Sequence, residues 1–281
     1  MLLHRLPDTK RNVGRRLSLG PLFAFLAALW TVFFLKPAPA AALLEEEKNT
    51  IDIYERVASS VVNITTSVCE PEILFCPVPQ AAGLGSGIII RKEGLIVTNH
   101  HVIADARSLR VTLSDGTQAE ARVVASAPEH DIAVIRIDVP KKPLRAITMG
   151  DSEGLRVGEK VLAIGNPFGL GQTLTTGTVS MLGRDIKTDG MILRGLIQTD
   201  ASINPGSSGG ALVDSKGELV GMSTITLSPT GGNVGIGFAI PVNRIKTVTP
   251  GLISTWRRSL GWIAAAAIAA WIIRRIYRAG R

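Results

Sequence analysis

The sequence predicts an all-β fold, a barrel or a sandwich, from many short apolar or alternating runs separated by turn residues. The turn signals include Lys92-Glu-Gly94 and Asp214-Ser-Lys-Gly217. Clusters of this kind end strands, and many short strands at such spacing are typical of barrels and sandwiches. We expect strands, in chain order, over Ser86–Arg91, Leu95–Thr98, Leu109–Leu113, Ala119–Ser126, Ile132–Ile137, Lys160–Ile164, Leu212–Val213 and Leu219–Ile225.

One helical element is expected before these strands. Residues Thr50–Ser59 form a short amphipathic pattern with Tyr54 on it, and this helix would lead into the first strand. The region that carries the helix and the strands has roughly two hundred residues, which is enough for two small barrels.

Three segments carry the residues of a serine nucleophile site. Ser208 lies in a glycine-rich turn, while His101 and Asp131 lie upstream of it in Thr98-Asn-His-His-Val102 and His130-Asp-Ile-Ala-Val134. A serine hydroxyl is a weak nucleophile at neutral pH, so it needs a histidine to take its proton and a buried acid to orient the imidazole. The chain supplies these groups in the order His, Asp, Ser.

This order separates folds that share the chemistry. The Gly-x-Ser-x-Gly pattern around Ser208 also fits the nucleophile elbow of α/β-hydrolases, in which the histidine follows the serine. All four histidines here precede Ser208, which excludes that fold. The subtilisin order would need His101 or His130 to pair with an earlier acid such as Asp52 or Asp115, and it is the less favoured alternative.

Six segments in matching order resemble the Deg/HtrA family of trypsin-fold serine proteases. The family patterns T-N-x-H-V, D-I/L-A-V and N-x-G-N/S-S-G-G-A-L are similar to Thr98-Asn-His-His-Val102, Asp131-Ile-Ala-Val134 and Asn204-Pro-Gly-Ser-Ser-Gly-Gly-Ala-Leu212. The other three segments are Gly165-Asn-Pro-Phe-Gly169, Gly177-Thr-Val-Ser180 and Gly235-Ile-Gly-Phe-Ala-Ile-Pro241. The resemblance covers residues 48 to 246.

The resemblance implies a fold and a role for each site residue. The fold is two six-stranded β-barrels of the chymotrypsin/trypsin type, with His101 and Asp131 in the first barrel, Ser208 in the second and the active site between them. His101 would be the general base, Asp131 its orienting partner and Ser208 the nucleophile. The backbone N–H groups of Gly206 and Ser208 would form the oxyanion hole, and glycine suits position 206 because such a turn often needs unusual φ and ψ angles.

Two adjacent histidines leave the identity of the base open on spacing alone. If the segment is extended, the side chains of His100 and His101 point to opposite faces, so only one can enter the cleft and the pair cannot chelate a metal. The family pattern selects His101. His100 is then expected to be a half-exposed neighbour without a catalytic role.

The resemblance also indicates where specificity and regulation reside. Trypsin-like enzymes that cut after Lys or Arg carry an acid six residues before the nucleophile, where this sequence has Ser202. We therefore expect an aliphatic S1 pocket with Ile203, Ile236 and Ile240 as walls, and cleavage after small or medium aliphatic residues of unfolded chains. Arg184 lies at the position of a family loop that relays activation to the oxyanion turn. The alternative is that Arg184 is a solvated loop residue without this role.

Composition and charge exclude several other functions. The formal charge of +8 belongs to the tails: residues 1–42 carry six basic and one acidic residue, residues 251–281 carry six basic residues, and residues 43–250 carry nineteen basic and twenty-two acidic residues. A nucleic-acid surface on the folded domain is therefore not expected. The glycine clusters lack the pattern of a dinucleotide-binding loop, and we expect no cofactor and no metal.

Apolar stretches in both tails predict membrane helices. Leu17–Leu35 has nineteen residues without a charge after five basic residues, which suits a membrane span, although Ala38-Pro-Ala40 leaves a cleaved signal sequence open. Ser259–Ile273 has fifteen uncharged residues between arginine pairs, with an interfacial helix or a docked core helix as alternatives. If both segments span, the positive-inside rule puts both tails in the cytoplasm and the protease domain in the periplasm or an equivalent extracytoplasmic space.

The chain has two cysteines, Cys69 and Cys76, in a segment expected to form the loop after the first strand. In an oxidising compartment they could form a disulfide that closes this loop. Two free thiols are the alternative. The spacing is not that of a metal site.

These observations predict five segments along the chain. Residues 1–16 are a basic cytoplasmic tail, 17–36 a transmembrane anchor or signal sequence and 37–47 a linker. Residues 48–250 are the trypsin-like protease domain, and 251–281 a C-terminal membrane helix and basic tail. Many family members carry PDZ domains after the protease, each of roughly 80 to 100 residues, whereas 31 residues follow Pro250. A PDZ-less protease is therefore expected.

The sequence thus predicts a membrane-anchored serine endopeptidase of Deg/HtrA type. It would use a Ser-His-Asp acyl-enzyme mechanism to degrade misfolded or regulatory proteins outside the cytoplasm, in protein quality control and the stress response. The resemblance also implies a homotrimer built around the N-terminal segment of the protease. The alternative function is a non-proteolytic chaperone or scaffold with the same fold held inactive.

Overall fold

The computed structural model describes residues 43–67, 81–138, 143–167, 171–188, 191–226 and 234–256. The expected tail, anchor and most of the linker over residues 1–42, the stretch Ser259–Ile273, and Cys69 and Cys76 lie outside the described residues. In the part of the chain that the structure describes, no helix combines the length and the apolar composition that crossing a membrane requires.

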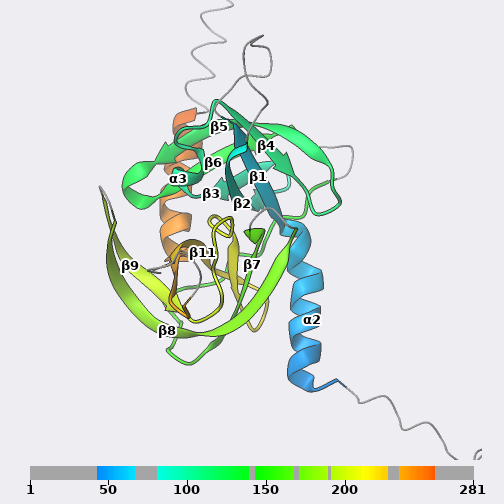
Figure 1. Ribbon diagram of the computed structural model, residues 1–281, viewed down its shortest axis with the longest axis vertical. Coiled ribbons are helices and arrows are strands. Elements are labelled where there is room, and N and C mark those ends of the chain that lie inside the picture. Colours follow the sequence, from blue (N-terminus) through cyan, green and yellow to red (C-terminus); the bar gives the residue numbers. More distant parts are fainter. Residues whose placement is uncertain are drawn as a thin grey trace, which may run out of the picture. The chain divides into compact units, whose positions relative to one another are not determined.

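Six antiparallel strands close into a first barrel, which occupies the upper half of Figure 1. Their order around the barrel is β1-β2-β3-β6-β5-β4, and β4 pairs back with β1. Closure leaves no unpaired strand edge in this ring. The strands are β1 (Val61–Ser67), β2 (Ala81–Arg91), β3 (Leu95–Thr98), β4 (Ser108–Thr112), β5 (Gln118–Ala127) and β6 (Ile132–Ile137).

Six further antiparallel strands form a second closed ring, in the lower half of Figure 1. Their order is β10-β11-β12-β9-β8-β7, and β7 pairs with β10. The two-barrel architecture implied by the family resemblance is therefore present. The strands are β7 (Lys160–Gly165), β8 (Thr173–Thr188), β9 (Met191–Thr199), β10 (Ala211–Asp214), β11 (Leu219–Thr226) and β12 (Gly237–Pro241).

A continuous apolar run in β2 explains how the two barrels are joined. Ile88 and Ile89 are both fully buried, because successive side chains of a strand point to opposite faces and both faces of β2 are covered. Ile89 lies in the interior of the first barrel with Ile64 and Ile135. Ile88 belongs to a shared core that also contains residues of the second barrel, such as Leu162. This shared core fixes one barrel against the other.

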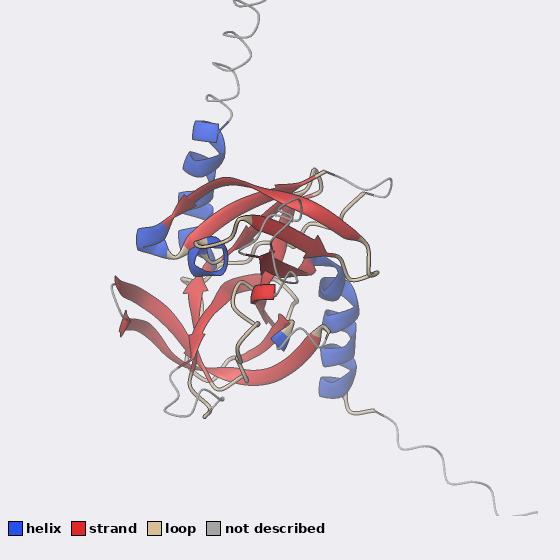
Figure 2. Ribbon diagram, turned by 45° about the horizontal axis from the view of Figure 1, so that its top comes forward, coloured by secondary structure: helices blue, strands red, loops and turns tan. Residues whose placement is uncertain are grey.

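Two helices flank the barrels (Figures 1 and 2). Helix α2 (Glu45–Val57) begins earlier than the expected start at Thr50, buries Ile53 and Val57 in the shared core, and continues into the short 3-10 helix η1 (Ala58–Ser60). Three glutamates lie in its first turn and Arg56 in its last, which complements the helix dipole.

The second helix covers residues 242–256 and was not predicted. Its buried residues Val242 and Ile245 lie in the shared core, and Ile253 packs with Leu95 and Val134 of the first barrel. These positions recur at helical spacing, so that one face of the helix is covered along its length. The expected domain end at residue 250 falls inside this helix, which contacts the barrels beyond that point.

The 242–256 helix should stabilise the fold through its last turn. We expect Ile253→Ala to lower the free energy of unfolding by about 2 to 4 kcal/mol, because a buried aliphatic side chain is lost and a cavity is left. Urea unfolding followed by circular dichroism measures the change. Ile51→Ala is the control, since Ile51 is 44% exposed on α2, and it should cost less than about 0.5 kcal/mol. Equal small losses in both variants would show that this end of the helix contributes no stability.

Candidate functional site

The turn before Ser208, called the nucleophile turn after the role expected of that serine, connects β9 to β10 and is shaped by a proline and a glycine. The Ser207 N–H donates to the Asn204 carbonyl oxygen over 2.8 Å, Pro205 follows Asn204, and Gly206 has a φ of 93°. A four-residue turn of this kind, with proline second and a positive φ third, is a type II turn and favours glycine at the third position. The unusual backbone angle expected at Gly206 is therefore present.

Ser208 follows this turn with its side chain partly exposed. Its hydroxyl donates to the Thr224 carbonyl oxygen over 2.9 Å. Among the described residues, the Ser208 hydroxyl makes no hydrogen bond to His101, and the N–H groups of Gly206 and Ser208 donate to no protein acceptor. Those two N–H groups are thus available to a ligand.

His101 and Asp131 form a close pair in the first barrel. The His101 Nδ1 atom lies 2.9 Å from Asp131 Oδ2 and 3.0 Å from Oδ1, and the His101 backbone N–H donates to Oδ1 over 3.0 Å. Asp131 is 1% exposed, whereas the His101 side chain is 44% exposed. A carboxylate beside Nδ1 favours the proton on that nitrogen, which leaves Nε2 as the acceptor on the exposed side of the ring.

Asp131 is held in a backbone conformation that is uncommon for a residue other than glycine. Its φ is 53° and its ψ is 39°. The Asp131 carbonyl oxygen accepts hydrogen bonds from the Asn99 side chain and from the His100 N–H, over 3.1 and 3.2 Å. The surrounding hydrogen bonds therefore hold Asp131, the residue beside the His101 ring, in this conformation.

The two histidines lie on a helical turn, α3 (His100–Ile103), and not on the extended segment considered from the sequence. The alternation argument therefore does not apply to them. The structure nevertheless brings His101, and not His100, to the Asp131 carboxylate. His100 is partly buried, and its Nδ1 atom has no hydrogen-bond partner among the described residues.

Thr224, in β11, connects these groups and was missed by the sequence analysis. Its hydroxyl donates to Asp131 Oδ2 over 2.7 Å, and its carbonyl oxygen accepts from the Ser208 hydroxyl. One residue of the second barrel thus contacts both Asp131 of the first barrel and Ser208. In the sequence Thr224 is only one residue of an apolar strand, and no motif marks it.

His101, Asp131 and Ser208 line one cavity of about 420 Å³. Ile203 also lines it, as expected of an S1 wall. The described residues that border it are otherwise mainly aliphatic or small polar: Thr188, Met191, Leu193, Asn204, Pro205, Thr224, Ile225 and Thr226.

Two of the expected pocket walls are placed elsewhere. Ile240, in β12, is fully buried in the shared core and does not line the cavity. Ile236 packs against the same core and does not line it either. The side-chain alternation of β12 and its pairing with β11 direct the Ile240 side chain into the shared core. Ser202 borders a separate, much smaller cavity of about 30 Å³.

Arg184 lies in a strand and not in the expected loop. It pairs with Leu196 across β8 and β9, next to Gly183, which has a φ of 71° and follows an irregularity in the register. The Arg184 side chain is exposed, and its Nε atom donates to Gln198 Oε1 over 3.2 Å. The glycine bends the strand without ending the pairing, which explains why the sequence suggested a loop.

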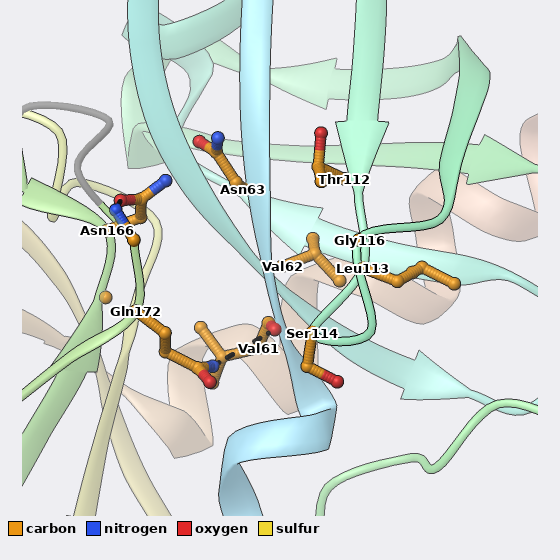
Figure 3. A pocket seen from close by; sticks show the side chains of 11 residues that line it. Val61, Val62, Asn63, Thr112, Leu113, Ser114, Gly116, Asn166 and Gln172 are labelled. Atoms are coloured by element: carbon orange, nitrogen blue, oxygen red, sulfur yellow. Dashed lines mark hydrogen bonds between the residues drawn. The ribbon is translucent and has the colours of Figure 1, made fainter.

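A second cavity, of about 370 Å³, lies where β1 and the turn after β4 face residues beside β7 (Figure 3). Three amide side chains, Asn63, Asn166 and Gln172, line it. Two of their groups bind the protein backbone: Gln172 Nε2 donates to the Ala58 carbonyl oxygen over 2.7 Å, and Asn166 Oδ1 accepts from the Gly171 N–H. The cavity lacks His101, Asp131 and Ser208. Across the described ranges, no cluster of three or more His, Cys, Asp or Glu side chains could hold a metal ion.

Comparisons with known proteins agree with this geometry. A family profile described as a trypsin-like peptidase domain matches residues 85–222. Protease Do-like 1, chloroplastic, of Arabidopsis thaliana is 44% identical over 237 residues, which are 83% of this chain and 54% of the relative. The periplasmic serine endoprotease DegP of Escherichia coli (strain K12) is 52% identical over 171 residues, which are 60% of this chain and 36% of the relative. The chain thus spans about half or less of these relatives.

A solved structure supplies a match over nearly a whole relative. The crystal structure of Deg5 is 36% identical to this chain and superimposes with a TM-score of 0.62. The match covers 75% of this chain and 97% of Deg5. The chain therefore belongs to the Deg/HtrA family of serine proteases with a trypsin-like peptidase domain.

Proposed function

We propose that this protein is a serine endopeptidase of Deg/HtrA type that cleaves unfolded or regulatory proteins outside the cytoplasm. The observation that carries the proposal is the meeting of three groups in one cavity: the buried Asp131, the His101 ring bound to it, and the Ser208 hydroxyl. The names of relatives, which include periplasmic and chloroplastic proteases, support the reaction and the compartment.

In the first half of the reaction, Ser208 Oγ attacks the carbonyl carbon of the scissile peptide bond and its proton passes to His101 Nε2. The oxygen of that carbonyl becomes negative and accepts hydrogen bonds from the Gly206 and Ser208 N–H groups. The protonated His101 then gives its proton to the leaving amine as the C–N bond breaks, which leaves an acyl group on Ser208.

In the second half, water attacks the acyl carbon and gives a proton to His101. The Ser208 ester bond breaks, and His101 returns the proton to Ser208 Oγ. Asp131 remains ionised throughout and stabilises the imidazolium, because its buried carboxylate faces Nδ1. The donors of the oxyanion hole contribute a few kcal/mol each, about 3 to 4 for a single donor in such sites.

The resting arrangement must change before the reaction can begin. The Ser208 hydroxyl donates to Thr224 and must turn toward His101 Nε2 before attack. Hydrogen bonds of a serine site often tighten only when substrate binds. A chaperone or scaffold with this fold would keep the hydroxyl on Thr224 even when an unfolded chain occupies the cavity.

The cavity favours aliphatic side chains next to the cleaved bond. Ile203, Leu193 and Met191 line it, and Asp131, the acid among its described residues, is already bound to His101. A lysine or arginine side chain would therefore lack a free acid partner there. We propose cleavage after small or medium aliphatic residues, and sequencing of the peptides released from casein tests it: cleavage mainly after Lys or Arg would contradict it.

We also propose that the chain is membrane-anchored, acts as a homotrimer and uses Arg184 to relay activation. These proposals rest on the apolar tails and on the family resemblance. Alkaline carbonate extraction of membranes from expressing cells should leave the full chain in the pellet, and its release into the supernatant would argue against an anchor.

Light scattering of the detergent-solubilised chain should give the mass of three copies.

Removing the nucleophile should abolish proteolysis. We expect Ser208→Ala to lower kcat on fluorescein-labelled casein by at least about 10⁴-fold, because the hydroxyl that forms the acyl-enzyme is lost. The control is Ser254→Ala, which removes an exposed hydroxyl that donates to the Gly251 carbonyl oxygen of its own helix, and which should keep wild-type activity. Degradation by Ser208→Ala at the wild-type rate would refute the proposed function.

Removing the charge of the orienting acid should slow the reaction without unfolding the protein. Asp131→Asn keeps the side-chain volume but disfavours the His101 tautomer with the proton on Nδ1, and we expect kcat to fall by about 10³- to 10⁴-fold. Steady-state kinetics on casein measure the loss. Asp105→Asn changes an exposed acid and serves as the control. If both variants had wild-type kcat, Asp131 would not orient the base.

A further inference from the structure

We infer that Ser86, in β2 of the first barrel, is a positioning residue that holds the nucleophile turn of the second barrel in its reactive arrangement. Ser86 does not line the cavity that contains the three catalytic groups, and the mechanism assigns it no step. The inference rests on the proposed function, because the turn it holds is the one that carries the nucleophile and the oxyanion donors.

Ser86 uses its polar groups to join the barrels. The residue is fully buried. Its N–H donates to the Ser208 carbonyl oxygen over 2.7 Å, and its hydroxyl donates to the Gly206 carbonyl oxygen over 2.8 Å. The two residues whose N–H groups would form the oxyanion hole thus both have their carbonyl oxygens bound by Ser86.

The direction of the hydroxyl proton follows from a further contact. The Asn166 N–H donates to Ser86 Oγ over 2.9 Å, so this oxygen acts as the acceptor toward Asn166 and directs its own hydrogen to Gly206. Asn166 directly follows β7 and borders the second cavity in Figure 3. A single buried hydroxyl therefore links three segments: β2, the end of β7 and the nucleophile turn.

Holding a carbonyl oxygen constrains the neighbouring N–H because peptide units are planar. The backbone can rotate only about φ and ψ of each residue, so a rotation of Gly206 that also turns its carbonyl group must break the hydrogen bond to Ser86. Glycine is the residue with the least intrinsic restriction on these angles, and its φ here is 93°. The constraint has to come from elsewhere, and the Ser86 hydroxyl supplies it.

The packing around Ser86 leaves little room for an alternative arrangement. A Cβ atom added at Gly209 would lie 2.1 Å from the Ser86 carbonyl oxygen, and one added at Gly165 would lie 3.3 Å from the Ser86 hydroxyl oxygen. The Ser86 carbonyl oxygen also accepts from the Thr98 hydroxyl over 2.7 Å. Glycines at 165 and 209 thus permit the close approach on which the Ser86 contacts depend.

The test compares Ser86→Ala with two other variants of the full chain. We expect Ser86→Ala to lower kcat on casein by about 10- to 100-fold, the range expected when reacting groups are slightly misplaced, with KM changed by less than about twofold. Labelling of Ser208 by a fluorophosphonate should slow to a similar degree.

Thr66→Val is the matched control, because it removes a hydroxyl that bonds the Gly83 carbonyl oxygen between β1 and β2, away from the turn. It should keep wild-type kcat even if its melting temperature falls.

Ser86→Cys keeps the shape of the side chain, with a larger atom and a weaker donor in place of the hydroxyl, and it should fold and show an intermediate kcat even if Ser86→Ala does not fold. Wild-type kcat in a folded Ser86→Ala or Ser86→Cys variant would overturn the inference. An equal loss of kcat in Thr66→Val would also overturn it, since the loss would then come from the lower stability of the fold and not from the contacts of Ser86. These results differ from failure of the proposed function, in which the wild type itself would neither degrade casein nor be labelled at Ser208.

Discussion

The site depends on hydrogen bonds that cross from one barrel to the other. Thr224 of the second barrel donates to the Asp131 carboxylate, and Ser86 of the first barrel binds the backbone of Gly206 and Ser208. His101 and Asp131, the proposed base and acid, come from one barrel and Ser208, the proposed nucleophile, from the other, so their separation is set by how the barrels meet. A displacement of about 1 Å in a catalytic group can reduce the rate by two orders of magnitude.

The apolar core between the barrels makes these polar contacts strong. Ile88 and Leu162 are among the fully buried residues that exclude water from the joint. In such surroundings a hydrogen bond is electrostatically stronger than in water, and an unpaired polar group costs more. The Asp131 carboxylate can remain buried because His101 and Thr224 contact its oxygens. The apolar core thus fixes how the two barrels pack together. The hydrogen bonds across it then hold the side chains of the site in one arrangement.

The site residues that lie in sequence motifs could be predicted from the sequence. Those that matter only through their contacts in the folded chain could not. His101, Asp131 and Ser208 occur in patterns with recognisable order, and the structure brings them to one cavity. Thr224 and Ser86 act through backbone atoms and short side chains inside ordinary strands, so no pattern marks them. Ile240 was expected in the pocket because its run is aliphatic, but aliphatic character does not tell which face of a strand a side chain occupies.

The same limit applies to the fold. The apolar strands β3 and β6 were predicted with their observed bounds, and β2 with its observed end but a start five residues too late. Strand β8 was not predicted, since its threonines and glycines show no clear alternation of buried and exposed positions. The helix over residues 242–256 was missed because its buried face is spread over both barrels. Its helical spacing becomes evident only when residues before and after position 250 are read together.

The most direct measurement of the central claim is covalent labelling of the purified full chain with a fluorophosphonate, located by peptide mass spectrometry. The probe reacts with a serine hydroxyl that a neighbouring base activates, with loss of fluoride. The account predicts one adduct, on Ser208, that is lost when His101 is replaced by alanine. A folded chain that carries no adduct on Ser208, even with unfolded casein present, would contradict it.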